Sequence, residues 1–259
     1  MRTAYITAII LFLILFTLVI MPPHLIGILF GWRISRYIPQ LWHQVAFRLL
    51  RLKIRIEGTP VRGEGVLYVS NHVSWVDIVV MGATLPASFV AKHEVGTWPV
   101  IKWLANLQRT VYVSRDRKTA DKERKAMQER LSRGDSLILF PEGTSGDGLR
   151  IQAFRSAFFS LADLQVDGHP VKVQPISLTY TQVDGFPVTR RSMPQVAWYG
   201  DMDLAPHLKN YLYGGPYEVR LKFHEPVTLE TVGNRKKLAN YCREKIVAGN
   251  SEALSASAA

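Results

Sequence analysis

A histidine and an aspartate five residues apart are the residues best suited to chemistry in this chain. His72 and Asp77 lie in the segment VLYVSNHVSWVD, residues 66–77, which begins with an apolar, β-rich run. An imidazole titrates near neutrality, so it is able to accept a hydroxyl proton and return that proton to a leaving group. A neighbouring carboxylate fixes the imidazole tautomer and stabilises the imidazolium. The segment therefore predicts a general base, His72, with Asp77 as its partner.

The spacing of this pair sets a condition on the local fold. Residues five apart on a regular helix point roughly 140° apart, because each residue turns the helix by about 100°. His72 and Asp77 therefore meet only if His72 lies in a turn before the helix, and Ser70-Asn71 has the residue types of such a turn. Otherwise His72 is a helix-capping residue and Asp77 an exposed helical carboxylate.

The sequence marks no nucleophile of its own. A hydrolase nucleophile elbow needs Gly-x-Ser-x-Gly, and the nearest stretch, GTSG at residues 143–146, lacks that spacing. Histidines without metal-ligand spacing and a single cysteine, Cys242, predict no metal site and no intrachain disulfide. Nucleotide-binding glycine motifs are absent from the sequence, so we expect no cofactor. These features favour direct attack by a substrate hydroxyl that His72 activates.

Two further turns carry candidate ligands for an anionic substrate. Glu142 follows the apolar run 136–140, and a carboxylate there is costly to bury unless it meets cations or hydrogen-bond donors. The loop 143–148 is rich in glycine, and its backbone N–H groups suit anions. Arg115 follows the run 110–114 and suits phosphate. Taken singly, each of these is equally compatible with an exposed loop.

Alternating strands and helices are expected to position these turns. We predict strands over residues 53–57, 66–70, 88–92, 110–114, 136–140, 171–180 and 218–227, and helices over 75–81, 97–106, 115–133, 154–164 and 235–248. This pattern predicts an α/β fold around a mostly parallel or mixed sheet, in which ligands bind beyond the carboxyl ends of strands. The catalytic domain is expected over residues 53–250, and the last residues, 251–259, as a disordered tail.

The amino terminus predicts a membrane anchor over residues 1–52. Residues 4–21 are uncharged and almost wholly apolar, and as a helix they reach roughly 27 Å, about the thickness of a bilayer core. Pro22-Pro23 is expected to end this transmembrane helix. A cleaved signal peptide is the alternative, but the apolar run is long and no small-residue cleavage site precedes the prolines.

The next stretch, residues 24–50, mixes apolar and aromatic side chains with arginines. This composition predicts interfacial or re-entrant helices, broken at Pro39, although a helix pair in the core of the catalytic domain gives a similar pattern. Basic residues after the first helix outnumber those before it, which places the catalytic domain on the cytoplasmic side of the inner membrane. The basic segment 115–133 is either a solvated helix or a docking face for anionic lipid or an acidic carrier protein.

Composition narrows the partners of the chain. The formal net charge is +11 over 259 residues, which suits nucleic acid, an anionic membrane or an acidic or phosphorylated substrate. The hydrophobic fraction is 47%, high for a soluble enzyme. Together with the anchor, this favours an anionic membrane surface as the partner, and we expect no nucleic acid.

Four sequence blocks, in order, resemble the glycerolipid acyltransferase family, typified by 1-acylglycerol-3-phosphate acyltransferase. NHVSWVD, VYVSR, FPEGT and VQPISL match the family's blocks across residues 66–180. The resemblance implies His72 as general base with Asp77, Arg115 as a phosphate ligand, Glu142, Gly143, Thr144 and Ser145 at the acceptor, and Pro175 shaping the acyl-donor site. It also implies the family's α/β fold and an acyl-coenzyme A or acyl carrier protein thioester as donor.

One position departs from the family pattern. Many phosphatidate-forming members have Glu-Gly-Thr-Arg-Ser in the third block, whereas Ser145 occupies the arginine position here. Arg150 and Arg155 are candidates to replace the missing guanidinium. The stretches EGTSGDGLR, AFRSAFF and WYGDMDLAPH also resemble lyso-ornithine lipid acyltransferases, whose acceptor carries no phosphate.

The sequence thus predicts a membrane-bound O-acyltransferase that acts on the free hydroxyl of a lysolipid. The primary expectation for the acceptor is 1-acyl-sn-glycerol-3-phosphate, giving phosphatidic acid, with lyso-ornithine lipid as the alternative. Two other classes stay open: a non-catalytic protein that binds anionic lipid, and a hydrolase that uses water as acceptor.

Overall fold

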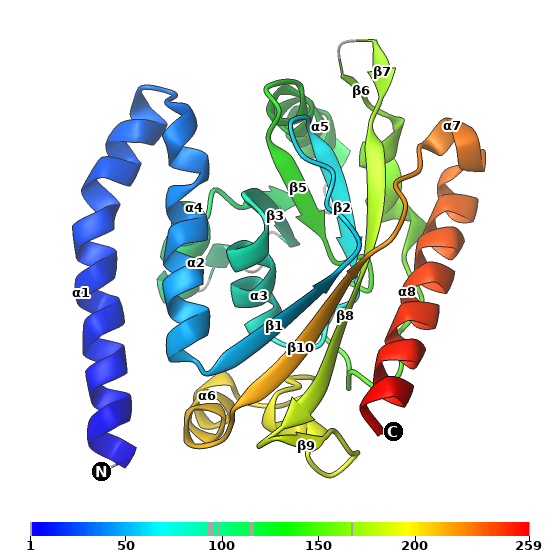
Figure 1. The fold of residues 1–259 in the computed structure, drawn as a ribbon. Coiled ribbons are helices and arrows are strands. Elements are labelled where there is room, and N and C mark those ends of the chain that lie inside the picture. Colours follow the sequence, from blue (N-terminus) through cyan, green and yellow to red (C-terminus); the bar gives the residue numbers. More distant parts are fainter. Residues whose placement is uncertain (1, 93–95, 98, 114–116, 167, 259) are drawn as a thin grey trace.

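A mixed, mainly parallel sheet forms the centre of the protein, as the strand pattern predicts (Figure 1). The computed structural model describes residues 2–92, 96–97, 99–113, 117–166 and 168–258. The sheet order is β1-β10-β8-β2-β5-β3-β4, with β9 paired to β8. Its strands are β1 (Leu52–Glu57), β2 (Val66–Ser70), β3 (Ala87–Lys92), β4 (Val111–Val113), β5 (Ser136–Leu139), β8 (Lys172–Val183), β9 (Phe186–Pro187) and β10 (Tyr217–Phe223). A separate ribbon consists of β6 (Gln165–Val166) and β7 (His169–Pro170).

Helices cover both faces of the sheet (Figure 1). They are α1 (Arg2–Leu29), α2 (Ile38–Leu49), α3 (Val76–Thr84), α4 (Pro99–Leu107), α5 (Arg117–Ser132), α6 (Leu204–Tyr213), α7 (Leu229–Val232) and α8 (Arg235–Ala258). Short 3-10 turns lie at η1 (Arg33–Arg36), η3 (Ser156–Asp163) and η4 (Met193–Gln195). The predicted mixed sheet flanked by helices is therefore confirmed.

Strand β2 separates two hydrophobic cores. Its alternate side chains point to opposite faces, so Val66 and Tyr68 join the core that contains α3, while Leu67 and Val69 join the core that contains α8. All five residues of β2 are buried, which explains the continuous apolar run in the sequence. Because β2 and β5 are parallel neighbours, their carboxyl ends meet at one edge of the sheet.

The first helix is longer than the sequence predicts. Instead of ending at Pro22-Pro23, α1 continues to Leu29 with both prolines inside it. Tertiary contacts hold the last turns of this helix. His24 Nε2 lies 2.7 Å from the Leu107 carbonyl oxygen, and a Cβ added at Gly27 would lie 3.2 Å from Ser35 Cβ. These contacts compensate for the backbone hydrogen bonds that the prolines cannot donate.

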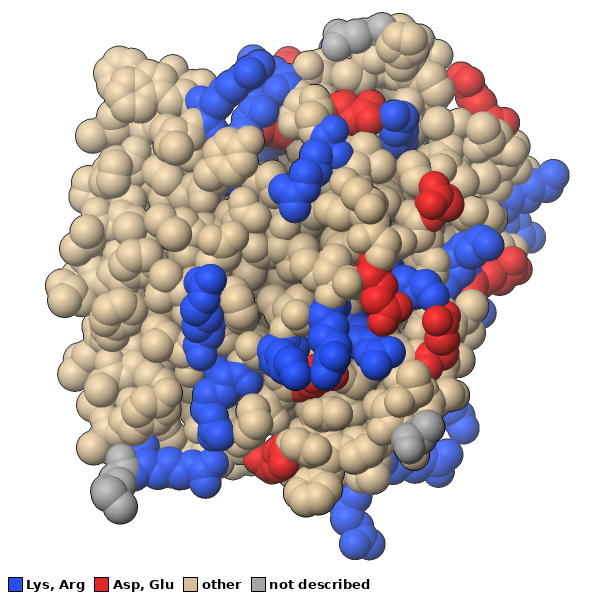
Figure 2. Space-filling model, viewed as in Figure 1, with Lys and Arg blue, Asp and Glu red and all other residues tan. Residues whose placement is uncertain are grey.

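Helix α1 packs against α2 and the rest of the protein rather than projecting away from it. Thr3 Oγ1 lies 3.0 Å from Tyr213 Oη at one end, and Trp42 Nε1 donates to Thr17 Oγ1 at 2.8 Å in the middle. Helix α1 is long and apolar enough to cross a membrane, and many large apolar side chains on it are exposed. Figure 2 shows this side of the molecule, on the left, almost without charged side chains.

Helix α2 connects α1 to the catalytic domain. It packs on α3 so closely that a Cβ added at Gly82 would lie 2.3 Å from the His43 ring. Its start also agrees with the break predicted at Pro39, which occupies the first turn of α2. One face of α2 is thus part of the domain core, the alternative that the sequence left open for this stretch.

Three other predicted segments differ from the structure in their type or in where they end. The disordered tail predicted over residues 251–259 is wrong, because α8 continues to Ala258, with Ala253 buried and Glu252 paired to Lys222 at 2.5 Å. Residues 156–163 form a 3-10 helix rather than the α-helix predicted over 154–164. Strand β10 ends at Phe223, four residues early.

The buried His43 predicts a stability that depends on pH. Its Nε2 lies 2.8 Å from Gln108 Oε1, and burial lowers its pKa from 6.5 to about 4. Between these values the unfolded chain binds a proton that the folded chain does not, so stability is complete above 6.5 and falls as pH falls towards 4. We expect a loss of about 3 kcal/mol, at about 1.4 kcal/mol for each pKa unit.

Urea unfolding in mild detergent at a series of pH values measures this loss. His43→Gln should make the pH slope shallower, whereas the exposed His169→Gln should leave it unchanged. Part of the slope should persist in His43→Gln, because the pKa of His224 is also lowered to about 4, chiefly by burial. An unchanged slope in His43→Gln would contradict the expected role of this residue.

Candidate active site

His72 and Asp77 meet at the carboxyl edge of the sheet. His72 lies in the turn between β2 and α3, and its Nδ1 is 2.8 Å from Asp77 Oδ2 in the first turn of α3. The geometric condition on the pair is thus fulfilled, because His72 precedes the helix. The His72 side chain is 19% exposed while that of Asp77 is fully buried, so solvent reaches the imidazole but not the carboxylate.

Four donors surround the Asp77 carboxylate. In addition to His72, the Val73 N–H at 2.6 Å and the Ser74 N–H at 3.0 Å donate to Oδ2, and the Tyr180 hydroxyl donates to Oδ1 at 2.7 Å. An ionised carboxylate only accepts, so His72 carries its proton on Nδ1 in this arrangement. The Nε2 lone pair is then available to take a proton from a substrate hydroxyl.

Residues that follow β5 hold the His72 turn in place. The imidazole stacks on Phe140, with ring centroids 4.3 Å apart. Glu142 Oε1 accepts from the His72 N–H at 2.8 Å, and Glu142 Oε2 accepts from the Gln152 N–H at 2.8 Å. Burial raises the pKa of the Glu142 carboxyl, and these two backbone donors oppose the rise. Glu142 thus ties the loop after β5 to the catalytic turn.

The glycine-rich loop packs directly on the histidine turn. The Gly146 N–H donates to the His72 carbonyl oxygen at 2.8 Å. Gly143 and Gly148 both have φ of +73°, a conformation that disfavours other residues. A Cβ at Gly148 would also lie 2.9 Å from Val73 Cγ1. The loop therefore needs glycine where it bends and where it touches the catalytic turn.

The other predicted site residues differ in their positions. Thr144 is exposed and Ser145 is half-buried, both in the loop that contacts His72. Pro175 is buried within β8 and pairs with Val69, near the end of β2. Arg115 lies outside the described residues. The roles of these residues in binding acceptor and donor stay predictions.

Tyr180 and Asn71 are supporting residues that sequence reasoning did not identify. Tyr180 reaches Asp77 from β8, where Ile176, Leu178 and Tyr180 alternate along one core face. Asn71 bonds twice to the Leu178 backbone, donating to the carbonyl oxygen at 2.8 Å and accepting from the N–H at 2.9 Å. The period-two pattern of β8 marks the face of Tyr180, but not its distance from Asp77.

A segment far along the chain also supports the catalytic turn. Trp75 Nε1 donates to His207 Nδ1 at 3.0 Å, and His207 Nε2 donates to the Ala197 carbonyl oxygen at 3.0 Å. The Trp198 N–H donates to the Val73 carbonyl oxygen at 3.0 Å. Residues 197–207 thus form one wall around the turn that carries His72.

A buried carboxylate, a partly exposed imidazole and a glycine-rich loop thus meet at one edge of the sheet, and together they have the groups that activation of a hydroxyl for acyl transfer requires. The Acyltransferase family model matches residues 52–179, which include this whole arrangement. A lyso-ornithine lipid O-acyltransferase of Rhizobium meliloti is 37% identical over 90% of this chain and 82% of its own length. Its counterpart in Brucella abortus is 40% identical over 83% and 82%.

Relatives that are named for an acyl acceptor with a phosphate group are also similar to this chain. A 1-acyl-sn-glycerol-3-phosphate acyltransferase of Neisseria gonorrhoeae is 36% identical, over 53% of this chain and 52% of its own length. The crystal structure of the 1-acyl-sn-glycerophosphate acyltransferase of Thermotoga maritima has the same fold, with a TM-score of 0.65 over 97% of each chain at 20% identity. The chain belongs to the family of lysolipid acyltransferases.

Proposed function

We propose that this acyltransferase esterifies the free hydroxyl of lyso-ornithine lipid with a fatty acyl chain from a thioester. The observation that carries the chemistry is the His72 Nδ1 to Asp77 Oδ2 contact of 2.8 Å, which leaves Nε2 available as a base. The choice of acceptor rests on four relatives that match between 76% and 90% of this chain, each of which is named for this lipid.

The chemistry follows from the free Nε2 of His72. Nε2 takes the proton of the acceptor hydroxyl as the oxygen attacks the thioester carbonyl carbon. Asp77 stabilises the imidazolium that forms. When the tetrahedral intermediate collapses, the carbon–sulfur bond breaks and the imidazolium returns its proton to the sulfur. The products are the ester and the free thiol of the donor, and His72 ends in its starting state.

One labelled acyl thioester offered with two acceptors tests this proposal. Purified protein should transfer label to lyso-ornithine lipid faster than to 1-acyl-sn-glycerol-3-phosphate. Thiol release without any lysolipid would indicate a hydrolase instead. No acceptor-dependent release at all would indicate a binding protein. Separate reactions with acyl carrier protein and coenzyme A as carriers identify the donor.

The second candidate acceptor is 1-acyl-sn-glycerol-3-phosphate, the primary expectation from the sequence blocks. Its support is the 36% identity to the Neisseria enzyme over half of the chain. One observation argues against this acceptor: residue 145 is a serine, whereas an arginine there would supply a guanidinium group that pairs with phosphate.

Ser145→Arg should therefore shift the acceptor preference towards 1-acyl-sn-glycerol-3-phosphate. Hydrogen bonds to charged groups contribute about 1.5–3 kcal/mol, so we expect kcat/KM for this acceptor to rise about tenfold relative to lyso-ornithine lipid. Thr189→Arg is the control, because it adds the same charge at an exposed position outside the predicted acceptor residues. Equal effects of both variants would indicate general charge attraction and not a role of position 145.

We further propose that the apolar face of α1 attaches the protein to the inner membrane, with the catalytic domain on the cytoplasmic side. This rests on the outward apolar side chains of α1 and on the excess of basic residues after it. The lysolipid acceptor has one hydrocarbon tail and the product has two, so both partition into that membrane. Membrane flotation of the full chain and of a variant with charged residues on the outer face of α1 tests the attachment.

A further inference from the structure

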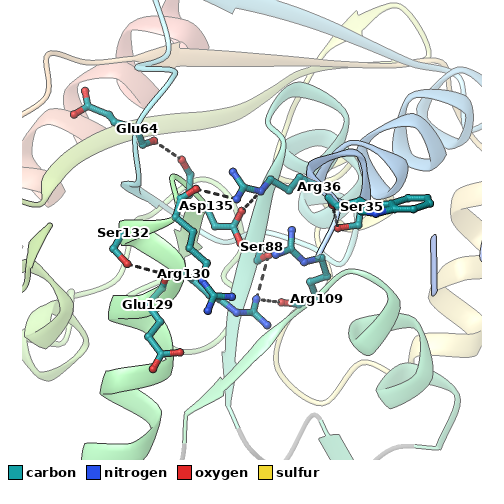
Figure 3. A network of polar contacts seen from close by, with 12 residues as sticks. Ser35, Arg36, Glu64, Ser88, Arg109, Glu129, Arg130, Ser132 and Asp135 are labelled. Carbon is teal, nitrogen blue, oxygen red and sulfur yellow. Dashed lines mark hydrogen bonds and ion pairs between the residues drawn. The ribbon is translucent and has the colours of Figure 1, made fainter. Parts of the chain in front are cut away.

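Three arginines gather near the buried carboxylate of Asp135, which directly precedes β5 (Figure 3). Arg36 Nε lies 2.5 Å from Asp135 Oδ1, and Arg109 Nη2 lies 2.5 Å from Asp135 Oδ2. Arg130 instead donates to the Arg109 carbonyl oxygen at 2.5 Å and to Ser88 Oγ at 3.4 Å. We call these three arginines and Asp135 the arginine site.

The arginine site has more positive charge than its own carboxylate neutralises. Among the described residues that line the cavity here, Arg36 and Arg109 are basic and Asp135 is acidic, so one positive charge remains. Arg130 does not line the cavity, but its contact with the Arg109 carbonyl oxygen brings a further positive charge close to it. Burial, followed by the repulsion of Arg109, lowers the pKa of Arg130. Within the described residues, no acceptor meets Arg109 Nε and Nη1, and the side chains of Arg36 and Arg109 stay about one-fifth exposed. An anion would complete the site.

The backbone of Arg109 supports a role beyond the ion pair. Arg109 follows α4 with φ of +59°, the left-handed conformation that helices usually reserve for glycine at this position. This conformation costs a residue with a Cβ about 1–2 kcal/mol. The chain nevertheless places here a long side chain whose guanidinium group reaches the cavity between α2, β3 and β5.

The arginine site is separate from the catalytic centre. It lies at the first residues of β3 and β5, whereas His72 follows the carboxyl end of β2, which is parallel to both strands in one sheet. The four residues of β5 alone span about 13 Å. An anion at the arginine site is therefore neither the attacking hydroxyl nor the thioester.

The surroundings of the arginine site are those of a membrane interface. Arg36 belongs to η1, the turn directly after the apolar helix α1. Large apolar side chains of this turn are at least half exposed, namely Leu29, Phe30, Trp32, Ile34 and Tyr37. Exposed aromatic rings lie at the depth of lipid headgroups, where arginines meet lipid phosphates.

We propose that the arginine site binds the phosphate of an anionic glycerophospholipid, such as phosphatidylglycerol. The bound headgroup would join η1 to α5 and to the residues after α4, because Arg36 belongs to η1, Arg130 belongs to α5 and Arg109 follows α4. It would thereby fix the α1–α2 hairpin against the catalytic domain at the membrane surface. This lipid is a bound partner and is not consumed by acyl transfer.

Vesicle flotation with charge-matched variants tests the proposal. Purified full-length protein is mixed with vesicles of phosphatidylcholine alone or of equimolar phosphatidylcholine and phosphatidylglycerol. Arg109→Gln should lower the phosphatidylglycerol-dependent part of binding about fivefold to tenfold. Arg33 is an exposed arginine of η1, the turn that also contains Arg36. Arg33→Gln removes the same charge as Arg109→Gln and should lower the phosphatidylglycerol-dependent part of binding less than twofold. Asp135→Asn should strengthen this part of binding, because it removes the competing carboxylate.

Each other outcome overturns the proposal. Equal losses in Arg109→Gln and Arg33→Gln would show diffuse attraction to the membrane. Weaker or unchanged binding in a folded Asp135→Asn variant would show an ion-pair latch without a ligand. Should Asp135→Asn fail to fold, as judged by thermal melting, the two arginine variants still decide. Saturable binding of inorganic phosphate without any vesicle preference would show a small-anion site.

Discussion

Replacing His72 with alanine should lower kcat/KM for acyl transfer about a thousandfold while the protein stays folded. General acid–base catalysis by a positioned side chain contributes about 10²–10⁴-fold, and His72 is placed to act both as base and as acid. The imidazole is the partly exposed member of the pair, with Nδ1 held by Asp77 and Nε2 available. Its removal deletes both proton transfers.

The fold should tolerate this change because the backbone makes the main contacts of the turn. The N–H of residue 72 donates to Glu142, and its carbonyl oxygen accepts from Gly146, whichever side chain is present. The measurement is transfer of labelled acyl chain to lysolipid, with thermal melting as the check on folding. His169→Ala, at an exposed position, is the control. Activity of His72→Ala within tenfold of the unchanged protein would exclude His72 as the base.

The catalytic pair was predictable because it depends on local sequence. An apolar strand, two turn residues and a five-residue spacing allow one geometry in which His72 and Asp77 meet, and the structure has it. Neighbouring parallel strands then bring residues that follow β5 to the same edge. This is why Glu142 and Gly143 could be assigned to the site although about seventy positions separate them from His72.

The role of Glu142 in the site was harder to predict from the sequence. The sequence suggested contact with the acceptor, whereas both carboxylate oxygens accept from the backbone N–H groups of His72 and Gln152. Such contacts depend on loop conformation, for which glycine content is only a rough guide. Tyr180 was missed for another reason: it lies in β8, and a strand pattern does not show that its hydroxyl reaches Asp77, 103 positions away in the chain.

The ends of helices were the least predictable feature. Pro22-Pro23 is a sound local reason to end a helix, yet the contact of His24 with Leu107 and the close packing of Gly27 on η1 accompany a helix that continues to Leu29. The carboxyl-terminal residues appeared too simple in composition to be ordered. There, Asn250 bonds to Thr179 at 2.8 Å, and this contact holds α8 on the sheet. In both cases tertiary packing outweighs local preference.

Changing Asp77 to asparagine should lower kcat about a hundredfold without disturbing the turn. The amide has one acceptor oxygen, and the N–H groups of Val73 and Ser74 require it at the Oδ2 position. The amide nitrogen then faces Tyr180, whose hydroxyl turns to accept. His72 keeps its Nδ1 donor and hence its reactive tautomer, so only the negative charge is lost. A charge-assisted hydrogen bond contributes about 1.5–3 kcal/mol, which corresponds to roughly 10–100-fold in rate.

Tyr180→Phe separates the charge of Asp77 from its packing. This variant keeps the carboxylate but leaves its buried Oδ1 without a donor, so it should lose about 1–3 kcal/mol of stability and less than tenfold in kcat. Single-turnover transfer and urea unfolding measure the two effects.

If Asp77→Asn keeps kcat within about threefold, the carboxylate charge does not stabilise the imidazolium. If it is as inactive as His72→Ala while folded, the tautomer is lost as well, and the two backbone donors do not fix the amide as argued.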